Sequence, residues 1–145
     1  MEATLFLADS AQTSPDGKLH ALGIGWTYTS SPMTAPSAVA FILHVPWPET
    51  NRKIKWTLDL LDGDGAPVVL QTGPENYSGL HMESEIEVGR PTGMKPGSDI
   101  NVPFAVNIAP MPLPPDGIFV WVLTVGDRKW RAPFTTRPLP RSPQQ

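Results

Sequence analysis

The chain has 145 residues, which is the size of one domain, and it contains no cysteine. The lack of thiols excludes disulfide scaffolds, thiolate metal sites and cysteine nucleophiles. Eleven basic and 14 acidic residues give a net charge of −3. The chain therefore lacks the excess of positive charge that is typical of proteins that bind nucleic acids, and no nucleic-acid partner is predicted. Proline, with 18 residues, makes up about 12% of the chain against a usual share of about 5%. This content argues against long helices and favours short strands separated by many turns.

Alternating apolar residues and turn signals predict eight or nine strands along the chain. They cover residues 3–8, 18–29, 38–45, 53–62, 66–72, 81–88, 100–108, 117–125 and 129–135. Residues 53–62 alternate most cleanly, with four apolar side chains from Ile54 to Leu60 facing inward. Pro103 limits its strand to a sheet edge or a bulge. Gly126 and Asp127 predict a final hairpin.

Short strands at this spacing predict one all-β domain. We expect an antiparallel β-sandwich, immunoglobulin-like or jelly-roll-like, with a β-barrel as the alternative. The sandwich takes residues 1–136, and residues 137–145 form a proline-rich tail whose composition does not pack a core. The N-terminus lacks a basic region before an apolar run, and no window has the ~18 apolar residues of a membrane helix. We therefore expect a cytoplasmic protein with no membrane partner.

An acidic face is the first candidate for chemistry. Glu83, Glu85 and Glu87 alternate on one strand at intervals of about 7 Å, a spacing that fits an inverting glycosidase. Three adjacent acids, however, indicate a solvated face, and Lys53 and Lys55 are placed to pair with them across strands. A hydrolase on this face is the weakest of three functional hypotheses, because it needs a carboxyl group with a raised pKa.

The other chemical motifs have structural explanations. The run from Asp62 to Gly65 has alanine where a calcium loop needs an oxygen ligand, and glycine in a tight hairpin explains it. His20, His44 and His81 lie on separate predicted strands, and no local pair of histidines suggests zinc. There is no nucleophile elbow and no phosphate-binding loop. The sequence predicts no enzyme activity, no metal and no cofactor.

The strand over residues 117–125 has an anomaly. One side carries large core residues, but the other carries Ile118, Val120 and Val122. A sandwich strand with a solvated outer face should alternate with polar residues. We therefore expect this outer face to lie under a loop, under the chain's own tail or under another chain.

Trp47 and the tail are the remaining interface candidates. Trp47 lies between two prolines, where its ring either plugs the end of the sandwich or is exposed to bind a sugar, peptide or subunit. The tail matches the pattern that SH3-type grooves bind, but such a pattern arises easily in proline-rich segments, and a clasp onto a neighbouring subunit is favoured. The tail residues singled out are Arg137, Pro138, Leu139 and Pro140.

Several stretches in a fixed order resemble a family of uncharacterised proteins found in actinobacteria and in the phages that infect them. The stretches are residues 7–12 (LADSAQ), 16–26 (DGKLHALGIGW), 45–47 (VPW), 58–65 (LDLLDGDG), 88–91 (VGRP) and 113–117 (LPPDG). The resemblance covers nearly the whole chain as far as Pro138. It implies a small β-sandwich with no assigned activity, transfers no site residues, and favours a phage-encoded or phage-derived protein.

Together these observations favour a non-enzymatic module that assembles with copies of itself or with another protein. The resemblance makes a phage accessory component, such as a capsid decoration or tail-associated protein, its concrete form, with the virion as a further location. The alternative is a soluble binding module for a host protein or, less favoured, for a glycan through Trp47.

Overall fold

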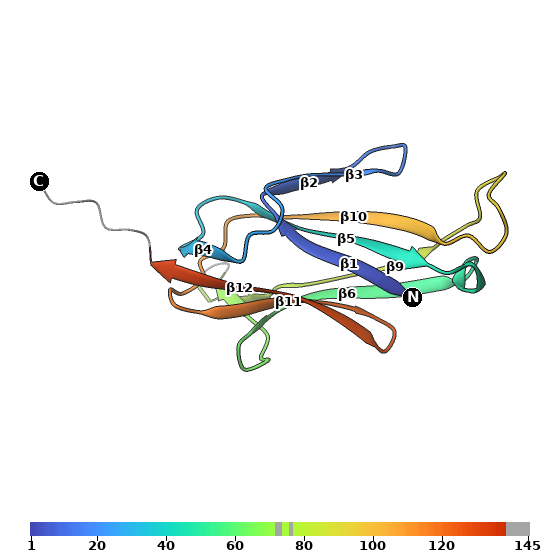
Figure 1. Cartoon of the computed structure of the whole chain (residues 1–145). Helices are drawn as coiled ribbons and strands as arrows, with labels where there is room; N and C mark the ends of the chain where they lie inside the picture. The colour runs from blue at the N-terminus through green and yellow to red at the C-terminus, as the bar shows by residue number, and fades with distance from the viewer. Residues whose placement is uncertain (72–73, 76, 139–145) are drawn as a thin grey trace, which may run out of the picture.

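The computed structural model of the protein describes residues 1–71, 74–75 and 77–138, and nearly all regular structure in it is β-strand (Figure 1). The strands are β1 (Glu2–Ala8), β2 (Ser10–Thr13), β3 (Leu19–Leu22), β4 (Tyr28–Ser31), β5 (Ser37–Val45), β6 (Lys53–Asp62), β7 (Val69–Gln71), β8 (Tyr77–Gly79), β9 (His81–Glu87), β10 (Ile100–Ile108), β11 (Ile118–Val125) and β12 (Arg128–Pro138). A three-residue 3-10 turn, η1 (Trp47–Glu49), follows β5. In the part of the chain described, no helix is long and apolar enough to span a membrane.

Two sheets pack face to face and confirm the predicted sandwich (Figure 1). The smaller sheet has the strand order β1-β5-β10, and the larger has the order β4-β12-β11-β6-β9. The described strands of the two sheets form separate hydrogen-bonded ladders, so the barrel alternative is not adopted. One detail differs from the expectation, because β12 pairs with β4 in parallel while the other strand pairs among the described residues are antiparallel.

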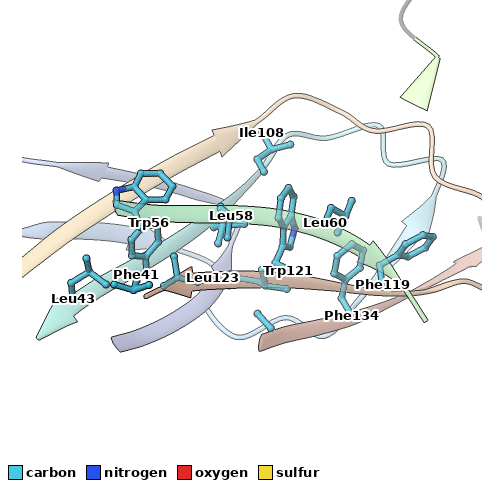
Figure 2. Close-up of a cluster of buried hydrophobic side chains, with 14 of the residues drawn as sticks. Phe41, Leu43, Trp56, Leu58, Leu60, Ile108, Phe119, Trp121, Leu123 and Phe134 are labelled. Carbon is cyan, nitrogen blue, oxygen red and sulfur yellow. The ribbon is translucent and has the colours of Figure 1, made fainter. Parts of the chain in front are cut away.

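The core lies between the inner faces of these sheets (Figure 2). Alternate residues of β5, β6 and β11 point into it, and Phe41 packs edge-on against Trp56 at 5.1 Å between ring centroids. Trp56 and Trp121, on inward-facing positions of β6 and β11, are 6% and 1% exposed. Each large apolar side chain that is fully buried contributes about 1.5–3 kcal/mol, so this layer is the main source of stability.

Three sequence predictions are confirmed closely. Strand β6 covers the predicted residues 53–62. Strand β10 pairs with β5 and forms an edge of its sheet, as expected from Pro103, which has no N–H to donate to a second neighbour. Strands β11 and β12 form the final hairpin around Gly126, whose φ of 62° suits the tight turn.

The single strand predicted over residues 18–29 is wrong. The chain forms β3, leaves the strand conformation at Gly23 and Gly25, and resumes as β4. These glycines have φ values of 68° and 94°, which other residues rarely adopt. The amide of Gly25 donates to the carbonyl of Leu7 at 2.9 Å. The glycines therefore let the chain pass the edge of β1 on its way to the larger sheet.

Strands β2 and β3 form a ribbon that covers the outer face of the smaller sheet (Figure 1). Small residues allow the close approach, because Ala11 of β2 is buried against Ala38 and Ala40 of β5. The side chain of Asn107 on β10 accepts from the Ala11 amide at 3.3 Å and donates to the Ala11 carbonyl at 2.8 Å. Strand β2 was not predicted, because it has only four residues and most of them are polar or small.

The number of strands exceeds the eight or nine predicted. Besides β2 and the division of residues 18–29, the strand predicted over 66–72 is reduced to β7, which pairs with the unpredicted β8. Residue 72 lies outside the described residues. Strand β12 continues to Pro138, so the sheet reaches past the predicted domain boundary at residue 136.

Candidate functional site

The outer face of the larger sheet carries the anomalous residues of β11, the middle strand of the five. Ile118 is 62% exposed, Val120 is half-buried and Val122 is only 4% exposed. Val122 is thus covered within the chain, as expected for part of this face, but the cover comes from the neighbouring strands rather than from a loop or the tail. Only Ile118 offers a largely exposed apolar side chain at this strand.

The register of the flanking strands accounts for this gradient. Val122 lies opposite Asp59 of β6 and Arg131 of β12, whose side chains share its face. Beside Ile118 the chain has already turned at Gly63, which has no side chain to cover it. Coverage therefore decreases from the middle of β11 toward its start.

A hollow of about 570 Å³ opens beside Ile118. Apolar and proline residues contribute much of its lining, including Val69, Pro112 and Pro114. Val69 is 55% exposed, and Tyr28, opposite Thr135 in the same row of the sheet as Ile118, is also 55% exposed. This end of the sandwich thus presents several large apolar side chains to solvent.

Charges are distributed unevenly across the same outer face. Strand β12 places Lys129 and Arg131 there, and neither forms an ion pair with another described residue. In the same two rows, β6 and β9 place Asp59, His81 and Glu83. In these two rows the face carries cations on β12, uncharged residues on β11 and the carboxylates of Asp59 and Glu83 on β6 and β9, whereas further along β6 the same face carries Lys53 and Lys55.

His81 joins the two carboxylates of this acidic side. Its Nδ1 is hydrogen-bonded to Asp59, and its Nε2 lies 3.3 Å from Glu83 Oε2. The hydrogen bond with Asp59, followed by that with Glu83, raises the pKa of His81. The hydrogen bond with His81, followed by the nearby charge of Lys55, lowers the pKa of Glu83.

These contacts argue against the hydrolase hypothesis. A general acid needs a raised pKa in a desolvated cleft, whereas Glu83 is exposed and its pKa is shifted downward. The predicted cross-strand pairs are present, with Lys55 Nζ 3.4 Å from Glu83 and Lys53 Nζ 3.7 Å from Glu85. The acidic strand is a partly paired, solvated face.

Trp47 lies in η1 and is half-buried. The guanidinium of Arg90 stacks over its ring at 4.1 Å from the centroid and also donates to the Trp47 carbonyl at 3.0 Å. A second donation, from Arg90 Nε to Thr50 Oγ1 at 2.7 Å, fixes the guanidinium. One face of the Trp47 ring is therefore covered by Arg90 of the same chain. The ring surface that remains accessible to a sugar or a subunit is smaller than that of an exposed loop tryptophan.

The first tail residues belong to the sheet. Arg137 and Pro138 pair with Ser30 and Ser31 of β4, and the Arg137 guanidinium stacks over Tyr28 at 4.2 Å. Assigning these two residues to the tail is therefore wrong, because parallel pairing with β4 extends the strand. The candidates Leu139 and Pro140 lie outside the described residues.

The other polar clusters are structural. The carboxylate of Asp62 accepts from the amides of Asp64 at 2.9 Å and Ala66 at 3.0 Å, which is the expected hairpin turn. At the tip of the ribbon, Ser14 is hydrogen-bonded both to Asp16 and to His20, so serine rather than histidine is central, unlike in a catalytic triad. Within the described ranges, no group of three or more potential ligands could hold a metal ion.

Sequence reasoning missed the basic side of the outer face. The signal was present in residues 129–135, where Lys129 and Arg131 alternate with the inward-facing Trp130, Ala132 and Phe134. What the sequence could not show was which strands lie beside β12, and hence that its cations share rows with Asp59 and Glu83.

Comparisons with known proteins give one match. No curated protein and no solved structure is significantly similar to the chain. A family model described as "Family of unknown function (DUF6941)" matches residues 3–137, which is nearly the whole sandwich. The chain therefore belongs to this family of unknown function.

Proposed function

We propose that this protein is a non-enzymatic β-sandwich that works by assembling with other protein chains. The observation that carries the proposal is the exposed apolar end of the larger sheet, where Ile118 is 62% exposed beside a hollow of about 570 Å³. Exposed apolar residues that gather beside a hollow are typical of protein interaction sites. The described polar clusters, in contrast, are explained by turns, ion pairs and loop contacts.

An accessory component of a phage particle is the concrete form of the proposal. It is supported by the resemblance in the sequence and by the three-layered, helix-poor architecture of the described residues, which suits a rigid building block. The family itself has no assigned function, so the particle-associated role is to be tested directly.

The test compares the wild-type chain with Ile118→Lys. The exposed position tolerates a long polar side chain, so the variant should fold normally while the apolar contact is lost. Solution mass is measured by light scattering over a range of concentrations. Both chains are then used as baits in lysate of the source cells with and without phage, and bound proteins are identified by mass spectrometry.

The proposal expects either a wild-type oligomer that Ile118→Lys dissociates or a protein that only the wild-type bait captures. Recovery of a particle protein in the second arm supports the phage form. A wild-type monomer, together with identical captures by the two baits, refutes assembly through this end of the sandwich.

A glycan-binding module is the second candidate, and a hollow away from Trp47 supports it. A hollow of about 290 Å³ is lined by Trp26 and Tyr28 together with Asp9 and hydroxyl side chains of residues 29–37. Aromatic rings beside hydroxyl and carboxylate groups suit a sugar ring. Loss of glycan binding in Tyr28→Ala but not in Ile118→Lys would favour this candidate over assembly.

A further inference from the structure

We infer that the outer face of the larger sheet is a self-complementary surface on which a second copy of this chain docks, related by a twofold axis parallel to β11. The inference rests on the proposed function, because it names the partner and the geometry of the assembly. Two observations carry it, namely the order of charges across the sheet and the central position of β11 in that order.

The register aligns the relevant side chains in rows that cross the sheet. One row contains Arg131, Val122, Asp59 and His81 on consecutive strands from β12 to β9. The next row contains Lys129, Thr124, Thr57 and Glu83 on the same strands. Both rows begin with a cation on β12, pass an uncharged residue on β11 and reach one carboxylate, Asp59 on β6 or Glu83 on β9.

A twofold axis along β11 exchanges the two sides of the sheet and keeps the position along the strands. Strand β11 then lies over β11 of the second copy, and β12 lies over β6 of the second copy. Arg131 therefore faces Asp59 of the second copy, and symmetry makes this contact twice. An axis running across the strands would instead place β12 over β12 and oppose like charges, which disfavours association.

Apolar residues fill the part of this surface next to the charged rows. Val120 lies between Leu61 and Pro133, and Ile118 precedes it by two residues on the same strand. Under the twofold axis, Val120 meets Val120 of the second copy, and Leu61 lies over Pro133. The charged rows thus set the orientation while the apolar rows contribute the burial.

The area suits a weak dimer. Strand β4 pairs only beside residues 135–138 and β9 only beside residues 53–59, so β12, β11 and β6 make up the part of the face that overlaps in the two copies. Three strands about 4.8 Å apart and eight residues of about 3.4 Å each give a face of roughly 400 Å². Two such faces bury roughly 800 Å² in total, below the range of about 1,200–2,000 Å² for stable complexes and typical of transient ones. This size predicts a weak affinity that decreases further as salt screens the ion pairs.

The first experiment reverses one charge at a time. Arg131→Glu and Asp59→Arg each oppose like charges at both symmetric contacts, so each should weaken the dimer by at least about tenfold in sedimentation velocity. Mixing the two variants in equal amounts restores both contacts and should restore the dimer as a heterodimer. Lys95→Glu, on an exposed loop between β9 and β10, makes the same charge change elsewhere and should leave the dimer unchanged.

The second experiment places the axis. Because the chain has no cysteine, Thr124→Cys introduces a single thiol on β11. Packed sheets lie about 10 Å apart, which is too far for a disulfide but within reach of a short bis-maleimide. Thr124→Cys should cross-link efficiently, whereas Lys95→Cys should not. Circular dichroism and thermal melting confirm that every variant folds.

The outcomes separate this inference from the proposed function. Recovery of the dimer only in the mixture, together with cross-linking at residue 124, supports the twofold arrangement. A dimer that withstands Arg131→Glu and does not cross-link at residue 124 overturns the inference but leaves assembly standing. A wild-type chain that stays monomeric at high concentration and low salt also overturns it, and the capture experiment then decides the proposed function.

Discussion

Asn107 anchors the outer ribbon, and replacing it with alanine should release β2 from the smaller sheet. Its side chain makes two hydrogen bonds to the backbone of Ala11, which is buried at 7% exposure. A net hydrogen bond contributes about 0.5–1.5 kcal/mol, and a buried group left unpaired costs about 1–3 kcal/mol. We therefore expect the ribbon to lose about 1–3 kcal/mol against local opening.

Amide hydrogen exchange measures this loss at single residues. Since about 1.4 kcal/mol corresponds to a factor of ten, the Ala11 amide should exchange roughly five to 150 times faster in Asn107→Ala. The amide of Leu123, in the main core, should change less. Asn101→Ala is the matched control, because Asn101 is on the same strand but is hydrogen-bonded to His44 at 2.8 Å rather than to the ribbon. Unchanged exchange at Ala11, or equal acceleration in both variants, would refute the reasoning.

Three further predictions concern the stability of the sandwich, measured by urea denaturation. Leu58→Ala removes a fully buried side chain and should cost about 2–5 kcal/mol, and a cost below about 1 kcal/mol contradicts the assigned core. Gly117→Ala places a methyl group against the ring of Phe119, closer than van der Waals contact allows. Because Phe119 is itself stacked on Phe134, the substitution should cost about 1–3 kcal/mol, whereas Gly63→Ala, at 3.4 Å from Ile118, should cost less. The pKa of His81 is raised in the folded chain, so the stability that its protonated ring contributes is complete below the unfolded pKa of about 6.5 and is lost as pH rises through the folded pKa. The free energy of unfolding should therefore fall over this pH window in the wild type but not in His81→Gln. An equal fall in both chains would exclude His81 as the cause.

The sequence predicted those parts of the fold whose conformation depends on a single residue or on the residue pattern of a single strand. The alternation of apolar and polar residues in β6 predicts where the strand begins and ends and which side chains face the core. Pro103 has no N–H to donate, and this alone predicts that β10 lies at a sheet edge. The prediction of one strand over residues 18–29 was wrong, because the alternation of residues continues through Gly23 and Gly25, whereas the left-handed conformations of these glycines interrupt the strand.

The candidate site was less predictable because burial on the outer face depends on neighbouring strands. The pattern of β11 identified Ile118, Val120 and Val122 as unusual, but it could not show that Asp59 and Arg131 flank Val122. The alternation of charges and the facing Lys–Glu pairs were correctly predicted on β6 and β9. Their relation to the cations of β12 depends on strand order, which is not encoded in any local pattern.

The parallel pairing of β12 with β4 has a consequence for synthesis of the chain on the ribosome. Residue 135 pairs with residue 28, which is made 107 positions earlier. Until β11 and β12 have emerged, the inner face of the smaller sheet has only part of its covering layer, and β4 has no partner in its sheet. Such distant pairings favour slow folding, on the scale of milliseconds to seconds for β-sandwiches. The nascent protein therefore passes through a stage in which apolar surface is exposed, and a chain truncated before residue 118 would be prone to aggregate.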